Sequence, residues 1–122
     1  AAKAGAAAVL AAATDPFCAD AVRLNAAANG VAIGFTADDL IGTIGDWDVL
    51  LAGDVFFDRA LAARLTPWFA DLAARGTDIL IGDPGRYYLP KAGLTALATY
   101  QVPVTRALED AEVKKTTVWR FG

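Results

Sequence analysis

Apolar and polar positions change period several times along the chain, and these changes divide it into short segments. Four apolar runs, too short for helices, are expected to form strands. They are residues 7–14, 31–36, 49–52 and 79–81. Between the runs, apolar residues recur every three or four positions over residues 16–29 and 58–75, which predicts two amphipathic helices. The pattern therefore predicts strands that alternate with helices.

The C-terminal third has a different pattern. Residues 91–99 predict a short helix, and residues 102–106 and 113–121 predict two strands. The acidic Glu109-Asp110 loop between these strands indicates an antiparallel hairpin. Alternation earlier in the chain indicates a mostly parallel sheet with helices on both faces. We expect one α/β domain over residues 1–122.

The stretch from Trp47 to Asp58 combines the strongest strand signal with candidate chemistry. Its run at residues 49–52 fits a strand buried on both faces of a parallel sheet. Gly53 and Asp54 then end the strand, and ligands of open α/β sheets bind outside the carboxyl ends of strands. Asp58 can cap the next helix. Alternatively, Asp54 makes a local turn and the phenylalanines that follow it are core.

One helix carries an internal proline. Pro67 lies inside the apolar periodicity of residues 58–75, so we expect a kink or a restart there, with Thr66 as a local cap.

Composition removes several kinds of chemistry. The 122 residues include no His and one Cys, Cys18, which excludes His-dependent triads, intrachain disulfides and Cys-cluster metal sites. We expect no bound metal. A formal net charge of -3 argues against nucleic acid as a partner, and charges and glycines interrupt every apolar run below membrane-spanning length. A reducing, cytoplasmic setting is the default expectation.

Carboxylates recur where the predicted strands end. Asp15 follows the first strand, Asp38 and Asp39 follow the second, and Asp54 follows the third. An acidic residue after the second strand of such a fold commonly binds a ribose diol, because an ionised carboxylate accepts both hydroxyl hydrogens. Together these positions indicate a ligand that contains a nucleoside.

At the level of motifs the chain resembles the class I S-adenosylmethionine-dependent methyltransferases. TDPF, LNAAANG and ADDL look like the ribose- and adenine-binding segments of that family. GDVFF matches the Asp-x-x-Phe/Tyr pattern of its seven-β-strand lysine methyltransferases. More specifically, LLAGDVFFD, ILIGDPGR and EDAEVKKTTVWRFG are similar to the electron transfer flavoprotein β subunit methyltransferases and to bacterial relatives labelled nicotinamide N-methyltransferases.

The resemblance implies a Rossmann-like methyltransferase sheet with S-adenosyl-L-methionine as cofactor. The implied cofactor-binding residues are Asp15, Asp38, Asp39, Leu40 and Gly53. Asp15 would bind the ribose hydroxyls and Asp39 the adenine amino group, with Asp38 as the alternative and Leu40 packed on the ring.

The resemblance also implies residues for catalysis and substrate binding. Asp54 would orient the acceptor amine and Phe57 would supply an aromatic wall for the methylated ammonium. Phe56, Arg86 and Tyr87 are implied to bind substrate. Each of these roles has a structural alternative. Arg86 and Tyr87 could belong to an ordinary surface loop, Asp15 could cap a helix, and Asp38 could be a charge that faces solvent.

One family motif does not occur in this sequence. No acidic-x-Gly-x-Gly segment, which follows the family's first strand and binds the methionine part of the cofactor, precedes Asp15. The family's first strand would lie between the strands at 7–14 and 49–52, and a sheet without it would expose two apolar edges. We therefore expect the chain to be the C-terminal part of a longer methyltransferase domain.

Three functions fit these observations. The first is a protein-lysine methyltransferase that acts on the electron transfer flavoprotein β subunit, so that its partner is a protein. The second is a small-molecule N-methyltransferase with the same cofactor. The third is a non-catalytic α/β domain that has lost cofactor binding.

Overall fold

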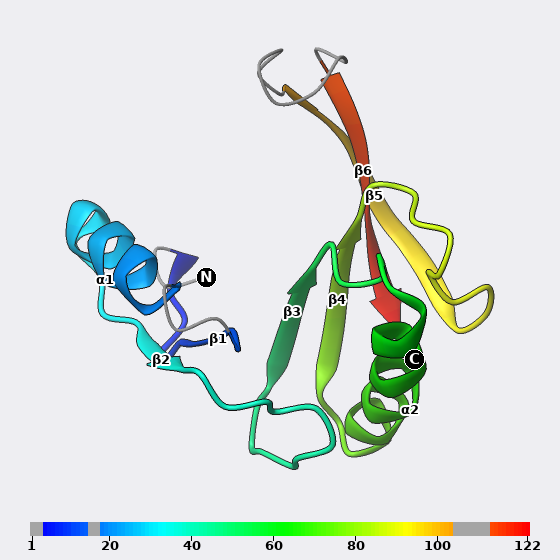
Figure 1. Ribbon diagram of the computed structural model, residues 1–122, viewed down its shortest axis with the longest axis horizontal. Helices are drawn as coiled ribbons and strands as arrows, with labels where there is room; N and C mark the ends of the chain where they lie inside the picture. The colour runs from blue at the N-terminus through cyan, green and yellow to red at the C-terminus, as the bar shows by residue number, and fades with distance from the viewer. Residues whose placement is uncertain (1–3, 15–17, 104–112) are drawn as a thin grey trace. The chain divides into compact units, whose positions relative to one another are not determined.

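The computed structural model describes residues 4–14, 18–103 and 113–122, and the chain divides into two compact units, residues 1–40 and 41–122 (Figure 1). We describe each unit by itself. The elements, in chain order, are β1 (Leu10–Ala12), α1 (Cys18–Asn29), β2 (Gly34–Thr36), β3 (Val49–Gly53), α2 (Arg59–Ala74), β4 (Asp78–Asp83), β5 (Leu94–Pro103) and β6 (Val113–Phe121).

The first unit is a strand-helix-strand motif. β1 and β2 are parallel, and Leu10 pairs with Gly34. α1 connects them and ends at Gly30, whose φ of 64° is readily accessible to glycine. Both strands are shorter than the apolar runs that predicted them, but the order and the parallel pairing agree with the prediction.

The second unit contains a four-stranded sheet in the order β3-β4-β6-β5. β3 and β4 are parallel, whereas β6 is antiparallel to both of its neighbours. The predicted C-terminal antiparallel hairpin is therefore confirmed. Its first strand was predicted to include residues 104–106, which lie outside the described residues.

The predicted helix at residues 91–99 is wrong. β5 begins at Leu94 and pairs with β6 from Leu94 opposite Phe121 to Pro103 opposite Val113, with an irregularity between Ala96 and Ala98. Pairing along a whole neighbouring strand supplies more stabilisation than the modest helix propensity of the Ala and Leu residues here, so tertiary context decides the conformation.

α2 begins as the sequence predicts. Asp58 is its N-cap, and the carboxylate accepts a hydrogen bond of 2.8 Å from the backbone N–H of Leu61. The expected kink or restart at Pro67 does not divide the element, which is one helix with the proline inside it. The hydroxyl of Thr66 donates to the carbonyl of Ala62 at 3.0 Å, so Thr66 is not a cap.

The core of this unit lies between α2 and one face of the sheet (Figure 1). Its fully or almost fully buried side chains are Phe56, Ala62, Leu65, Phe69, Leu72, Ile79 and Ile81. The rings of Phe56 and Phe121 both contact Phe69 edge-on, with centroids 6.1 and 5.9 Å away. Each large apolar side chain buried here contributes about 1.5–3 kcal/mol, so this core fixes the position of β4 under α2.

β3 is buried on one face, not on both. The side chains of Val49 and Leu51 are 50% and 61% exposed, whereas Leu50 and Ala52 are partly buried and pack against the core. In the part of the chain that the structure describes, β3 pairs with β4 alone and so forms an edge of the sheet.

The β5–β6 hairpin extends past the end of β4 (Figure 1). β4 ends at Asp83, which pairs with Thr117, while β6 continues its pairing with β5 from Thr116 back to Val113. Since β6 runs antiparallel to β4, this two-stranded extension projects from the end of the sheet at which β3 and β4 have their carboxyl ends. Among the described residues, no helix is both long and apolar enough to cross a membrane.

Candidate functional site at the carboxyl ends of β3 and β4

The carboxyl ends of β3 and β4 lie side by side. Gly53 is paired with Gly82, so the residues that follow them, Asp54 and Asp83, occupy equivalent places at the same edge of the sheet. Ligands of α/β sheets bind at such an edge. The site therefore begins with two carboxylates on neighbouring strands.

Asp54 has an unusual backbone conformation. Its φ is 47°, and positive φ values are uncommon in residues other than glycine. Residues with such values are concentrated at functional positions. The backbone N–H of Asp54 donates to the carbonyl of Gly82 at 2.8 Å, which extends the pairing of β3 with β4 by one bond. This conformation turns the chain sharply at the point where the carboxylate is needed.

The carboxylate of Asp54 is paired with Arg86. Nε and Nη2 of the guanidinium donate to Oδ1 and Oδ2, each at 2.8 Å, in the bidentate geometry that suits these two groups. The Asp54 side chain is 45% exposed and that of Arg86 is 39% exposed, so the pair borders solvent. The structure thus joins a residue predicted to be catalytic with one predicted to bind substrate.

The loop after β4 holds Arg86 in place. Oδ2 of Asp83 accepts hydrogen bonds from the backbone N–H groups of Gly85 and Arg86, both at 2.8 Å. Gly85 has a φ of 101°, which an L side chain rarely adopts. A buried carboxylate therefore organises the turn that follows β4.

The two phenylalanines after Asp54 have different environments. Phe56 is 0% exposed and packs in the core against Phe69, so its predicted role in substrate binding is not supported, and its side chain is part of the core as in the alternative reading. Phe57 is 59% exposed. Phe57 is therefore available as an aromatic surface, in line with the role predicted for it.

Two tyrosines follow Arg86. Tyr87 is 80% exposed and Tyr88 is 38% exposed, and their rings meet edge-on with centroids 5.2 Å apart. The ammonium of Lys91 lies 5.5 Å from the centroid of the Tyr87 ring, within the range of a cation–π contact. The predicted substrate residue Tyr87 is accessible and already in contact with a lysine ammonium.

The first unit contains the other predicted cofactor residues. Asp38 and Asp39 follow β2 and are exposed, and the backbone N–H of Asp38 donates to the hydroxyl of Thr36 at 3.2 Å. Leu40 is partly buried. Asp15 lies outside the described residues. Exposed carboxylates of this kind can accept hydrogen bonds from hydroxyl or amino groups of a nucleoside.

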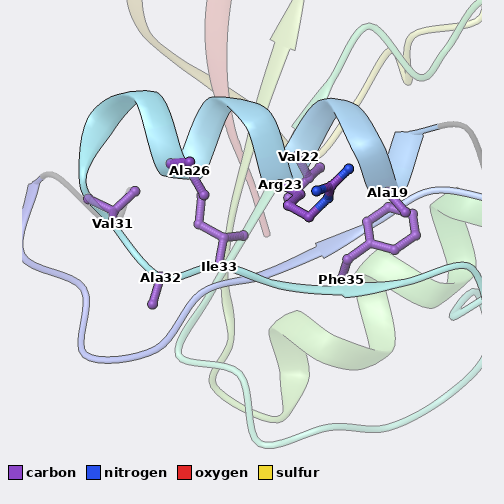
Figure 2. A pocket seen from close by; sticks show the side chains of 9 residues that line it. Ala19, Val22, Arg23, Ala26, Val31, Ala32, Ile33 and Phe35 are labelled. Carbon is purple, nitrogen blue, oxygen red and sulfur yellow. The ribbon is translucent and has the colours of Figure 1, made fainter.

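The same unit has a shallow hollow of about 520 Å³ beneath α1, shown in Figure 2. Its lining is mostly small and aliphatic: Ala19, Val22, Arg23, Ala26, Ala27, Val31, Ala32, Ile33 and Phe35. The charged Arg23 is paired with Asp20 at 3.1 Å, and both side chains are 73% exposed. Because a ligand site normally has several convergent polar groups, we do not assign a ligand to this hollow. Over the described ranges there is also no cluster of side chains suited to a metal ion.

Sequence reasoning missed Asp83. It follows a buried apolar run, as Asp54 does, but the neighbouring Pro84 and Gly85 gave the segment the pattern of an ordinary turn. The pattern that could have identified Asp83 is an acidic residue at the carboxyl end of a buried strand, and both Asp54 and Asp83 have it.

Comparison with known proteins finds several relatives that share one name. The chain is 36% identical over 125 residues to the electron transfer flavoprotein β subunit lysine methyltransferase of Danio rerio, covering 97% of this chain and 48% of that protein. The Xenopus laevis and Rattus norvegicus proteins of the same name are 36% and 32% identical over 124 residues. The chain thus spans about half the length of the curated relatives it matches. No family model matches it.

Solved structures of other proteins show a similar fold. The fold is similar to the N-methyltransferase NodS from Bradyrhizobium japonicum WM9 in complex with S-adenosyl-L-homocysteine, with a TM-score of 0.57, 12% identity, and coverage of 93% of this chain and 66% of NodS. A second NodS structure gives a TM-score of 0.55. The chain has the Rossmann-like fold of the class I methyltransferases, as predicted.

The resemblance to the electron transfer flavoprotein β subunit lysine methyltransferases, expected from three short motifs, is confirmed over 97% of the chain.

Proposed function

We propose that the chain is part of an S-adenosylmethionine-dependent N-methyltransferase whose acceptor is a lysine of the electron transfer flavoprotein β subunit. The observation that carries this proposal is the 36% identity, over nearly the whole chain, to relatives named for that activity. The fold supports the cofactor, because the similar NodS structure is a complex with S-adenosyl-L-homocysteine.

The residues proposed to hold the cofactor are those that the resemblance implied: Asp15, Asp38, Asp39, Leu40 and Gly53. The exposed carboxylates of Asp38 and Asp39 fit a ligand with hydroxyl and amino donors. The cofactor supplies a methyl group on a sulfonium sulfur, and in-line transfer of that group depends mainly on how the acceptor amine is positioned.

Asp54 is proposed to orient the acceptor amine. Each oxygen of a carboxylate can accept more than one hydrogen bond, so the pair with Arg86 does not by itself prevent Asp54 from accepting an amine hydrogen. Bound to Asp54 the amine would direct its lone pair away from the carboxylate. Phe57, which is exposed and follows Asp54 by three positions, is proposed to form an aromatic wall that favours the cationic product.

The Arg86 guanidinium gives the pair a further use. An unpaired carboxylate would stabilise the protonated ammonium of a lysine, which has no lone pair to attack a methyl group. Since the positive charge of Arg86 offsets the negative charge of Asp54, the site accepts a hydrogen bond from the amine without strongly favouring its protonated form. The pair therefore suits an acceptor that must react as the neutral amine.

The proposal is tested with the full-length protein and radiolabelled S-adenosylmethionine in a crude lysate, and then with purified electron transfer flavoprotein. Label in a protein band of the size of the β subunit is the expected result. Label in small molecules alone would indicate the small-molecule N-methyltransferase, and no transfer together with no cofactor binding would indicate the non-catalytic domain. The matched control is Asp54→Asn, which should lose the labelled band.

A further inference from the structure

Asp83 is a buried carboxylate with an incomplete set of partners. The residue is only 2% exposed, and its Oδ2 accepts two hydrogen bonds of 2.8 Å from backbone N–H groups. Oδ1 is buried and accepts no hydrogen bond from any residue within the described ranges. Burial of a charge costs free energy, and a buried polar atom without a partner adds to that cost. Stability alone therefore gives a poor account of an aspartate at this position.

The two donors to Asp83 identify what the carboxylate fixes. They are the consecutive N–H groups of Gly85 and Arg86, so the carboxylate sets the direction in which the chain leaves β4. Gly85 makes this turn possible through its φ of 101°. From its fixed backbone position, Arg86 extends its guanidinium across to Asp54. The contacts run without a gap from Asp83 through Arg86 to Asp54.

We propose that Asp83 is a positioning residue for methyl transfer, which holds the backbone of Arg86 so that the guanidinium keeps the Asp54 carboxylate in place. Asp83 is buried and acts through Arg86, so no contact with substrate or cofactor is required of it. The inference rests on the proposed function, because methyl transfer is the reaction that Asp54 is proposed to serve.

The test uses the full-length protein and three measurements: the single-turnover rate of methyl transfer, the affinity for S-adenosylmethionine and the thermal midpoint. Asp83→Ala removes both acceptor bonds and should slow transfer on the order of tenfold to a hundredfold, the scale on which misplacement by an ångström acts. Cofactor affinity should not change. Asp83→Asn keeps one carbonyl oxygen that can accept both N–H groups, so it should restore most of the rate.

A matched control lies at the other end of the same strand. Asp78 begins β4, and its carboxylate is paired with Arg120 through two contacts of 2.9 and 3.3 Å; at 41% its side-chain exposure is close to the 45% of Asp54 in the Asp54–Arg86 pair. Asp78→Ala removes a β4 aspartate and breaks an Asp–Arg ion pair like that of Asp54 and Arg86, but away from the carboxyl ends of β3 and β4. It should leave the rate of transfer by the folded protein unchanged.

A double-mutant cycle separates positioning from general stability. If Asp83 acts through Arg86, then Asp83→Ala combined with Arg86→Ala should be no slower than Arg86→Ala alone. A residue that merely stabilises the fold would give rate effects that multiply, or none at all. Multiplying effects would overturn the proposal.

Gly85→Ala provides a second variant if Asp83→Ala does not fold. No atom lies within 4 Å of the added Cβ, so the substitution strains the turn without disturbing the buried carboxylate or its packing. It should slow transfer with unchanged cofactor affinity. Full activity in Gly85→Ala and Asp83→Ala, measured beside an active wild type, would overturn the role of Asp83 alone, whereas an inactive wild type would contradict the proposed function itself.

Discussion

Asp54 and Arg86 are 32 positions apart in the sequence, and two parallel hydrogen bonds of 2.8 Å join their side chains at the carboxyl ends of β3 and β4. One residue ends a strand in a left-handed conformation, and the other belongs to the loop after the neighbouring strand. The relationship connects the predicted catalytic carboxylate to the loop that follows the inner strand β4.

Asp54→Asn should reduce methyl transfer by roughly a hundredfold or more, because it removes the charge that positions the amine and pairs with Arg86. Asparagine tolerates the φ of 47° at least as well as aspartate, so the turn should persist. The lost ion pair is partly exposed, and its loss should cost about 0–1 kcal/mol of stability. Single-turnover transfer and a melting curve on the same sample check both expectations; a destabilised variant with full turnover would refute the role of Asp54.

Arg86→Lys should lower transfer by roughly tenfold, although it keeps the positive charge. A lysine ammonium cannot reproduce two parallel hydrogen bonds to one carboxylate, so Asp54 would lose its fixed orientation. Arg120→Lys is the matched control, since Arg120 makes the corresponding contact with Asp78. Equal rates for Arg86→Lys and wild type would show that charge alone is required.

The two neighbouring phenylalanines should respond in opposite ways. Phe56→Ala removes a fully buried ring and should destabilise the protein by about 3–5 kcal/mol. Phe57→Ala removes an exposed ring and should leave the melting curve within about 0.5 kcal/mol of wild type. Because Phe57 is proposed to form a wall for the methylated amine, its variant should also raise KM or lower kcat. Chemical denaturation and steady-state kinetics of both variants provide the comparison.

Asp58→Ala should destabilise the second unit by about 1 kcal/mol, because the backbone N–H of Leu61 loses its capping acceptor. Asp71→Ala is the control within the same helix: its 3.4 Å contact with Arg75 is exposed and should contribute no more than about 0.5 kcal/mol. Urea denaturation measures both, and equal effects would contradict the assignment of Asp58 as the N-cap that stabilises α2.

The sequence predicted those elements whose local pattern and tertiary environment agree. α2 follows its apolar period and its cap, and β4 follows its apolar run. The segment from Leu94 to Thr99 failed because its alanines and leucines favour a helix locally, while pairing with β6 makes it a strand. The local sequence of this segment does not indicate that β6 will pair with it.

The candidate site was predictable only where a local sequence pattern was enough to locate a residue. Asp54 could be found from its place after an apolar run, since that position alone puts a carboxylate at the ligand-binding edge. Its pairing with Arg86 could not, because 32 residues separate the two. Phe56 and Phe57 are adjacent in an identical local pattern, and packing against α2 alone distinguishes core from surface.

The position of β4 has a consequence for the rate at which parts of the molecule open. β4 lies between β3 and β6, whereas β3 and β5 are edges of the described sheet, so amide hydrogens of β4 should exchange with deuterated solvent far more slowly than those of β3. The guanidinium of Arg86 ties the end of an edge strand to the loop of this protected strand. Fraying of β3 from its carboxyl end therefore has to break the Asp54–Arg86 pair, while β4 keeps its pairing with β6.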